Sequence, residues 1–229
     1  MSESAPCSGF QSRRFEPASS LDDFPTPPWA TRALTQLVLR NRLGLVWEPA
    51  CGRGHMARPL AERGHVFASD VFDYRFDPAS ALGWRGQDAV YNFLDRDAPP
   101  PQVQAGVDWI ITNPPFNRAR DFIATAFSHQ PRRGVAMFVR SAFLEGIDRF
   151  RLTFEPHPPA VVAQFVERVP IFRGRLTRRG STMTAYCWIV WRSDFRGPTR
   201  FQWIRPCRAK LEQDEDYPVA VSGGVDAYP

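Results

Sequence analysis

The chain has 229 residues, of which 43% are hydrophobic, and carries a formal net charge of +5. This length suits one main domain and is too short for two large ones. No apolar stretch is long enough to span a membrane, and no C-x-x-C pair is present, so the composition argues against a membrane protein and against a zinc site.

Both ends of the chain differ in composition from its middle. Residues 1–23 are rich in serine, proline and charge, and they contain no apolar core of the kind that a secretory signal needs. Residues 209–229 are first acidic and then interrupted by glycine and proline. We therefore expect a mobile tail at each end, a domain over residues 24–208, and a cytoplasmic location.

Short apolar runs alternate with helical patterns between these ends. Strands are predicted at residues 43–50, 65–71, 107–113, 134–140, 160–169 and 184–191, with a weaker one near 83–88; helices are predicted at 29–40, 54–63 and 117–129. In the last helix, Asn117 is expected to cap the first turn. The alternation predicts an α/β fold with a mostly parallel, seven-stranded sheet and helices on both faces.

A glycine-rich loop, "EPACGRGHMA", follows the first predicted strand. It matches G-x-G-x-x-A from Gly52, and its glycines permit a sharp turn and a close approach to a ligand. Asp70, at the end of the second strand, can accept hydrogen bonds from both ribose hydroxyls of an adenosine. NAD and S-adenosylmethionine both fit these features. Glu48 favours the second, because a carboxylate repels a pyrophosphate and attracts an amino acid's ammonium.

The segment "NPPF", Asn113 to Phe116, ends the strand at residues 107–113. Pro114 forces Asn113 into an extended conformation, and neither Pro114 nor Pro115 has an N–H group that needs a partner. The Asn113 side-chain oxygen and the Pro114 carbonyl can hold both hydrogens of a planar amine such as N6 of adenine, while Phe116 offers a ring for stacking. The alternative is a simple turn with Phe116 in the core.

The loop "EPACGRG" followed by "NPPF" resembles the class I S-adenosylmethionine-dependent methyltransferases, specifically the compact phage and prophage enzymes that methylate N6 of adenine in DNA. The similarity covers about residues 24–207. It implies a Rossmann-like fold, S-adenosyl-L-methionine as the cofactor, no metal, a monomer in a bacterial or phage-infected cell, and a target base flipped out of duplex DNA. Methyltransferases of ribosomal RNA guanine share NPPF, and those of protein glutamine carry a close NPPY variant. These substrates therefore remain alternatives, as does a catalytically silent nucleic-acid-binding protein.

The resemblance also assigns residues to the cofactor. Asn92 stands where the family has an aspartate, although its oxygen can still accept a hydrogen bond from the adenine amine, and Asp88 is a possible substitute. Phe116 stands where the family often has tyrosine. The implied cofactor residues are Thr26 and Pro27 at the methionine moiety, Glu48, Pro49, Ala50, Cys51, Gly52 and Gly54 in the loop, Asp70 at the ribose, and Asn92 and Phe93 at the adenine.

Basic segments supply the expected contacts to a polynucleotide. A loop between two predicted strands holds four arginines that we expect to bind phosphates, with Phe172 as a second stacking partner for an extruded base. A solvated hairpin is the alternative. The four arginines are Arg173, Arg175, Arg178 and Arg179; Arg140, Arg149 and Arg151, which follow another predicted strand, are expected to contact phosphates as well. The four histidines, His55, His65, His129 and His157, are expected to be structural or to face solvent.

Overall fold

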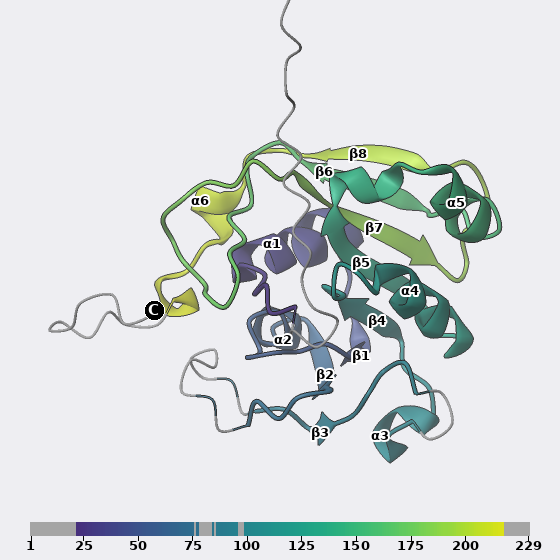
Figure 1. Cartoon of the computed structure of the whole chain (residues 1–229), viewed down its shortest axis with the longest axis horizontal. Helices are drawn as coiled ribbons and strands as arrows, with labels where there is room; N and C mark the ends of the chain where they lie inside the picture. The colour runs from purple at the N-terminus through teal and green to yellow at the C-terminus, as the bar shows by residue number, and fades with distance from the viewer. Residues whose placement is uncertain (1–21, 76, 78–83, 85, 96–98, 218–229) are drawn as a thin grey trace, which may run out of the picture.

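The computed structural model describes residues 22–75, 77, 84, 86–95 and 99–217. Most of the two predicted tails, residues 1–21 and 218–229, lies outside this part of the chain. The described residues form one sheet of eight strands in the order β3-β2-β1-β4-β5-β7-β6-β8 (Figure 1). These are β1 (Gly44–Glu48), β2 (Gly64–Asp70), β3 (Ala89–Val90), β4 (Trp109–Thr112), β5 (Gly134–Arg140), β6 (Val161–Phe165), β7 (Tyr186–Arg192) and β8 (Arg200–Ile204).

Nearly all of the sheet runs in one direction. Neighbouring strands are parallel except for β7, which is antiparallel to both β5 and β6. The carboxyl ends of β1, β2, β4 and β5 therefore share one edge, and Glu48, Asp70, Asn113 and Arg140 stand at these ends or directly after them. The predicted mostly parallel α/β sheet is confirmed.

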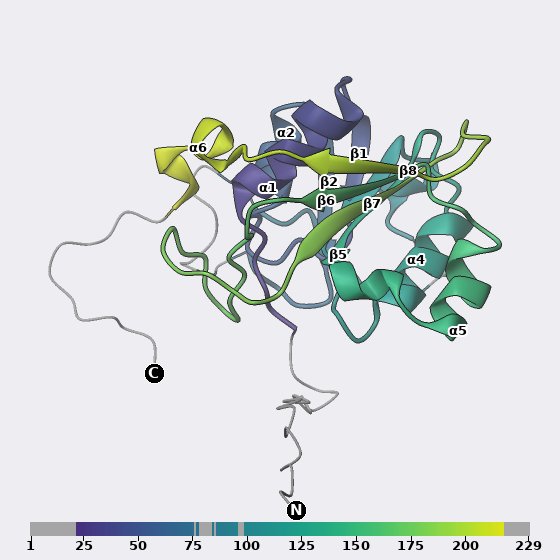
Figure 2. The ribbon, with the colours of Figure 1, turned by 90° about the horizontal axis from the view of Figure 1, so that it is seen from above.

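Helices cover both faces of the sheet. α1 (Pro28–Ala33) begins with a proline, whose fixed φ suits a first helical turn, and continues as the π-helix η1 (Leu34–Leu39). α1 and α2 (Ala57–Ala61) lie on one face, and α4 (Ala119–Ser128) lies on the other (Figure 2). The remaining helices are short: α3 (Pro101–Gln104), η2 (Ser141–Leu144), α5 (Ile147–Arg149), η3 (Phe150–Phe154), α6 (Arg208–Leu211) and η4 (Asp214–Asp216).

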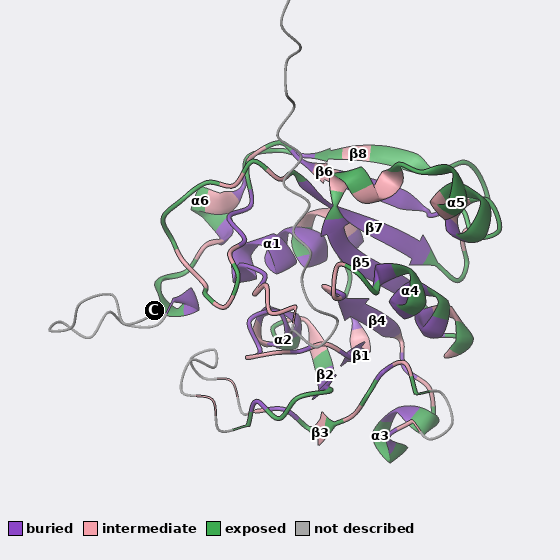
Figure 3. Ribbon diagram, viewed as in Figure 1, coloured by how far each residue is buried: buried purple, intermediate pink, exposed green. Residues whose placement is uncertain are grey.

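Each face of the sheet has its own hydrophobic core (Figure 3, buried residues in purple). Trp29 of α1 belongs to the cluster that contains Phe138 of β5, whereas Phe122 of α4 belongs to the cluster that contains Met137 of the same strand. Successive side chains of a strand point to opposite faces, so a strand covered on both faces reads as a continuous apolar run. This is why the sequence pattern located β5 with its bounds correct.

One strand, the position of another strand and one helix cap differ from those expected. The sheet has an eighth strand, β8, whose Phe201 and Trp203 are 53% and 61% exposed, so its apolar residues do not form the buried pattern that marks a strand. The weak strand expected near residues 83–88 is found at β3, Ala89–Val90. The N-cap of α4 is Arg118, and no side chain caps this helix, so the predicted cap at Asn117 is wrong.

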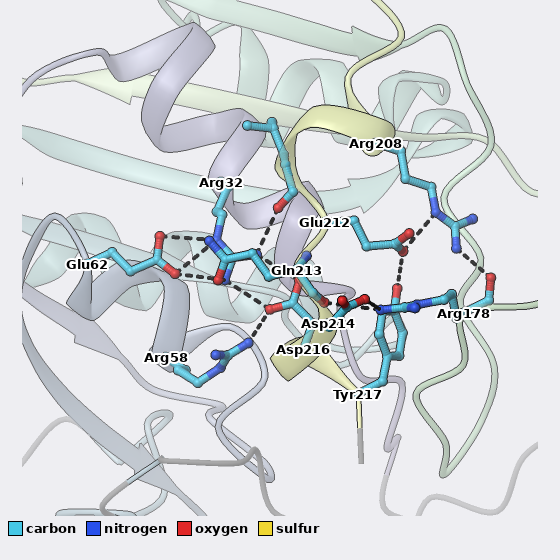
Figure 4. Close-up of polar contacts among 11 residues, drawn as sticks. Arg32, Arg58, Glu62, Arg178, Arg208, Glu212, Gln213, Asp214, Asp216 and Tyr217 are labelled. Atoms are coloured by element: carbon cyan, nitrogen blue, oxygen red, sulfur yellow. Dashed lines mark hydrogen bonds and ion pairs between the residues drawn. The ribbon is translucent and has the colours of Figure 1, made fainter. Parts of the chain in front are cut away.

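A buried arginine fastens the C-terminal segment to the domain. Arg32 of α1 is 1% exposed, and its guanidinium donates to both oxygens of Asp216 at 2.7 and 2.9 Å, to the side chain of Gln213 at 2.8 Å, and to Glu62 at 2.9 and 3.0 Å (Figure 4). Asp216 also accepts a hydrogen bond from Arg58 of α2. We call Arg32, Arg58, Glu62, Gln213 and Asp216 the Arg32 cluster.

Because of this cluster, the folded domain extends beyond the boundary expected at residue 208. Leu211 and Asp216 are buried, and the Leu211 carbonyl accepts a further hydrogen bond from Arg32 at 2.9 Å. The acidic composition of residues 209–217 suggested a mobile tail, but Asp216 is instead the partner of a buried cation. Residues 209–217 therefore pack as part of the domain.

Candidate functional site

A cavity of about 440 Å³ opens at the carboxyl edge of the parallel strands. Ligands of open α/β sheets bind at this edge, so the topology alone makes the cavity the first candidate site. Of the residues that sequence analysis assigned to a site, those lining the cavity are Thr26, Glu48, Pro49, Ala50, Cys51, Gly52, Asp70, Asn92, Phe93, Asn113 and Pro115. Four others, Pro27, Gly54, Pro114 and Phe116, lie within two residues of these in sequence but do not line it.

The glycine-rich loop bends around the end of β1. Gly52 and Gly54 have φ angles of +48° and +80°, which side chains with a Cβ rarely adopt. The Gly52 N–H donates to the Asp70 carboxylate at 2.9 Å, so this contact fixes the loop against the end of β2. A Cβ on Gly52 would meet no atom within 4 Å, and the space above the loop is therefore open to a ligand.

Two carboxylates lie side by side at the strand ends. Asp70 accepts the N–H groups of Gly52 and Phe72, and burial raises its pKa. Glu48 is 1% exposed and accepts a hydrogen bond from the Thr112 hydroxyl at 3.0 Å with one oxygen; its other oxygen has no partner among the described residues. Burial first, and the charge of Asp70 second, raise the pKa of Glu48 well above its usual range. The site therefore stabilises a cation placed next to Glu48.

Asn113 is held in one orientation by the segment that precedes α1. Its side-chain N–H donates to the Phe24 carbonyl at 2.9 Å. Its side-chain oxygen is buried and has no partner among the described residues. A buried acceptor without a donor costs free energy in the absence of a ligand, and this one belongs to a residue that lines the cavity. The arrangement is suited to accept a hydrogen bond from an N–H group of a bound molecule.

Phe116 has close neighbours that the sequence did not reveal. Its ring centroid lies 4.9 Å from that of Phe24 and 6.4 Å from that of Tyr186, and the Arg140 guanidinium carbon lies 4.0 Å from it. Its backbone N–H donates to the Asp22 carboxylate. Phe116 was expected to offer its ring for stacking on a base, but the ring already contacts Phe24 and Arg140.

The residues expected to contact the cofactor's adenine are already engaged in contacts within the protein. Phe93 is 2% exposed, and its ring packs 5.0 Å from Trp47 and 5.6 Å from His129, so most of it belongs to the core. The Asn92 oxygen accepts the Leu94 N–H at 3.2 Å. Asp88, the possible substitute, accepts the Ala68 N–H at 2.8 Å and does not line the cavity.

Sequence analysis assigned no binding role to His55, which lies on the cavity. It is 6% exposed, and its Nδ1 has no partner among the described residues. Burial, together with the charges of Arg53 and Arg58, lowers the pKa of His55 to about 4, so the ring is neutral near pH 7. The hydroxyl of Thr26, two residues before the start of α1, is likewise buried without a partner among the described residues. The position of His55 directly after the glycines was the available signal.

The predicted arginine loop does not line this cavity. Arg175 stacks on Phe172 at 5.2 Å, and Arg178 pairs with Asp214 at 2.7 Å. The ring of Phe172 also packs against Gly180, where an added Cβ would lie 2.8 Å from it. The predicted stacking residue therefore packs within its own loop. Arg173, Arg175, Arg178 and Arg179 are all exposed.

The described part of the chain contains neither a metal-binding cluster nor a membrane-spanning helix. No group of three or more His, Cys, Asp or Glu side chains is arranged to hold a metal ion. No helix there has the length and apolar character needed to cross a bilayer.

Comparison with solved structures identifies the fold. The chain aligns with a modification subunit of a putative type I restriction enzyme from Vibrio vulnificus at 17% identity and a TM-score of 0.53, over 81% of this chain and 48% of that one. It aligns with a type I restriction-modification methyltransferase subunit from Streptococcus thermophilus at 14% identity and a TM-score of 0.54, over 79% and 48%. This chain therefore spans about half the length of these two proteins.

A putative RNA methyltransferase from Pyrococcus horikoshii aligns at 15% identity and a TM-score of 0.50, over 71% of this chain and 81% of that one. No protein-family model and no curated protein matches the sequence. The structural likeness confirms the predicted Rossmann-like fold of the class I methyltransferases.

Proposed function

We propose that this chain transfers a methyl group from S-adenosyl-L-methionine to the N6 amine of adenine in DNA. The observation that carries the proposal is the state of Asn113. Its N–H group donates to the Phe24 carbonyl, and its buried oxygen, on a residue that lines the cavity, has no partner among the residues that the structure describes. An amine with two N–H groups would satisfy this oxygen and a second acceptor, the Pro114 carbonyl.

The cavity also fits the proposed cofactor. The Glu48 oxygen that has no partner among the described residues would accept a hydrogen bond from the ammonium of the methionine moiety, and Asp70, at the end of β2, would bind the ribose. The open space over Gly52 leaves room for the ligand to approach the backbone. Thr26 and His55 add two partnerless polar atoms on the same cavity. The bound cofactor would supply an electrophilic methyl group on a sulfonium.

The residues of this chain would contribute by positioning the target amine. The lone pair of an adenine amine is delocalised into the ring, and acceptors on both of its hydrogens would turn that lone pair out of the ring plane. As the bond from nitrogen to the methyl carbon forms, the bond from that carbon to sulfur would break and S-adenosylhomocysteine would be the leaving group; the methylated amine would then lose one proton to solvent. In duplex DNA the target adenine is stacked and paired, so we propose that it is flipped out, with phosphate contacts from the arginines of residues 173–179.

Three further features belong to the same proposal: a monomer, a cytoplasmic location in a bacterial or phage-infected cell, and the phage or prophage type of enzyme. They rest on the sequence resemblance, in which "EPACGRG" precedes "NPPF". RNA amines and protein glutamine would fit the same acceptors, and a catalytically silent nucleic-acid-binding protein would share the fold. The structural neighbours include both restriction-modification proteins and a putative RNA methyltransferase, so the choice of DNA rests on the sequence resemblance.

The test is methyl transfer from tritiated S-adenosylmethionine to unmethylated DNA, total RNA and a protein extract in parallel, followed by nucleoside or amino-acid analysis of the labelled polymer. Label recovered as N6-methyladenine in DNA is the expected result. Label in RNA or protein alone would keep the role of Asn113 and replace the substrate. No label in any polymer would overturn the proposed activity.

A further inference from the structure

Arg140 lies beside the proposed acceptor site but outside its cavity. It ends β5, the strand next to β4, and β4 leads directly into Asn113. Its guanidinium stacks on the Phe116 ring at 4.0 Å, yet Arg140 is exposed and does not line the cavity that Asn113 and Pro115 line. The Arg140 guanidinium is therefore placed where the backbone of a polynucleotide could lie when one of its bases enters the cavity.

Within the described part of the chain, Arg140 has no ion-pair partner. Among the described residues, no carboxylate lies within ion-pair distance of it. The polar group that it contacts is the Tyr186 hydroxyl, whose pKa is raised mainly by burial despite the positive charge of Arg140. Asp22 also acts on Tyr186, but its carboxylate accepts the Phe116 N–H.

Of the arginines in the predicted phosphate-binding loop, Arg178 differs from Arg140 in this respect, whereas Arg175 resembles Arg140 in its stack but lies away from the cavity. Arg178 is paired with Asp214 and stacks on Tyr217 at 4.9 Å, and Arg175 lies over the ring of Phe172. A planar guanidinium that stacks on an aromatic ring keeps its N–H groups in plane, where they can bind a phosphate in bidentate fashion. Arg140 combines such a stack with a position next to NPPF.

We infer that Arg140 binds a backbone phosphate next to the target nucleotide and so holds the polynucleotide while the base occupies the cavity. The inference rests on the proposed function and names a residue of the substrate side that the NPPF motif does not contain. Phe116 then positions the guanidinium in addition to any contact that it makes with the base.

The test compares Arg140→Gln with wild type in binding to a fluorescent duplex of random sequence, measured from 50 to 200 mM salt with S-adenosylhomocysteine present. Each lost phosphate contact lowers the slope of log K against log salt by about 0.9, which corresponds to about 3.5-fold over this range. We expect this loss of slope, a KM for DNA raised on the order of tenfold, and an unchanged kcat.

Two variants serve as controls. Arg200→Gln removes the same charge from an exposed position at the start of β8, at the opposite edge of the sheet, and is expected to leave slope and KM unchanged. Arg140→Lys retains the charge without the planar stack and is expected to retain the slope.

The failures of the two proposals are distinguishable. If wild type methylates no nucleic acid, the proposed function fails. If wild type methylates DNA and Arg140→Gln keeps its salt slope and KM, the role of Arg140 is wrong. A variant that loses S-adenosylhomocysteine binding along with activity would show that Arg140 supports the fold instead, and this would also overturn the inference.

Discussion

The cavity and the Arg32 cluster both bury polar groups, but they satisfy them differently. In the cluster, all three guanidinium nitrogens of Arg32 and both oxygens of Asp216 have partners. On the cavity, Thr26, Glu48, His55 and Asn113 each have a buried polar atom without a partner among the described residues. Among the described residues of the cluster, Arg58 Nε is the buried side-chain atom that lacks a partner. On the cavity four such atoms belong to residues that line one space, and a ligand in that space could supply the missing partners and remove the cost of burying them.

Arg32 in the cluster and Glu48 on the cavity also differ in what shifts their pKa values. Burial alone lowers the pKa of a guanidinium, but in Arg32 the hydrogen bonds and charges of Asp216 and Glu62 outweigh it and raise the pKa. No described residue supplies Glu48 with a cationic partner of this kind, and burial raises its pKa. The cluster therefore keeps its charges without any ligand, whereas the cavity favours a charged Glu48 only when a cation is present.

The largest expected effect is on stability, from Asp216→Ala. This change leaves Arg32 and Arg58 without their shared carboxylate, and breaking a buried ion pair from one side costs about 3–5 kcal/mol. Urea denaturation would measure it, with Asp214→Ala as the control. The Asp214 side chain is 91% exposed, so its loss should cost less than about 1 kcal/mol. Equal losses in the two variants would contradict a structural role for the cluster.

The next effect is catalytic. Asn113→Ala removes the acceptor proposed for the amine, and loss of one such positioned group slows transfer by about 10²–10³-fold. Affinity for S-adenosylhomocysteine should remain within about threefold of wild type, because the contact of Asn113 within the protein is to Phe24. Single-turnover methyl transfer and calorimetry measure the two quantities. Wild-type turnover would exclude the proposed role of Asn113.

A third effect is the response of stability to acid. The pKa of His55 is about 4 in the folded chain, below its ordinary value of about 6.5, so the unfolded chain binds a proton that the folded chain does not. Stability from this group is complete above pH 6.5 and is lost as the pH falls toward 4, by about 2 kcal/mol between pH 7 and pH 5. His55→Asn should flatten the pH dependence of the unfolding free energy by this amount. The exposed His65 provides the matched variant, His65→Asn, which should not.

The smallest expected effect concerns Glu48 and the cofactor. Because its pKa is raised in the free protein, a bound ammonium should lower that pKa and release a proton. Affinity for S-adenosylmethionine should then rise with pH through the range in which Glu48 ionises. Calorimetry in buffers of different ionisation enthalpy would detect the proton. Glu48→Gln should abolish its release and weaken binding about tenfold, and proton release that persists in this variant would assign it to another group.

Prediction from sequence succeeded where the signal is local. The apolar runs of β1, β2, β4, β5 and β7 are buried strands, and the glycine loop and NPPF follow their strands directly, so the meeting of Glu48, Asp70 and Asn113 at one edge followed from topology. Prediction failed where burial does not follow the usual pattern. The aromatic residues of β8 are exposed, and an acidic segment that reads as a tail contains the buried Asp216.

The parallel sheet, the glycine loop and the place of Asn113 at the end of a strand could be predicted from the chain alone, because periodicity and turn chemistry act over a few residues. The direction in which the Asn113 amide points depends on a tertiary contact, since its partner Phe24 is 89 residues away. Tertiary structure likewise placed Arg140 on Phe116 and joined Arg32 to Asp216 across 184 residues. Such contacts depend on which surfaces meet when helices and strands pack, and no local pattern in the chain specifies them.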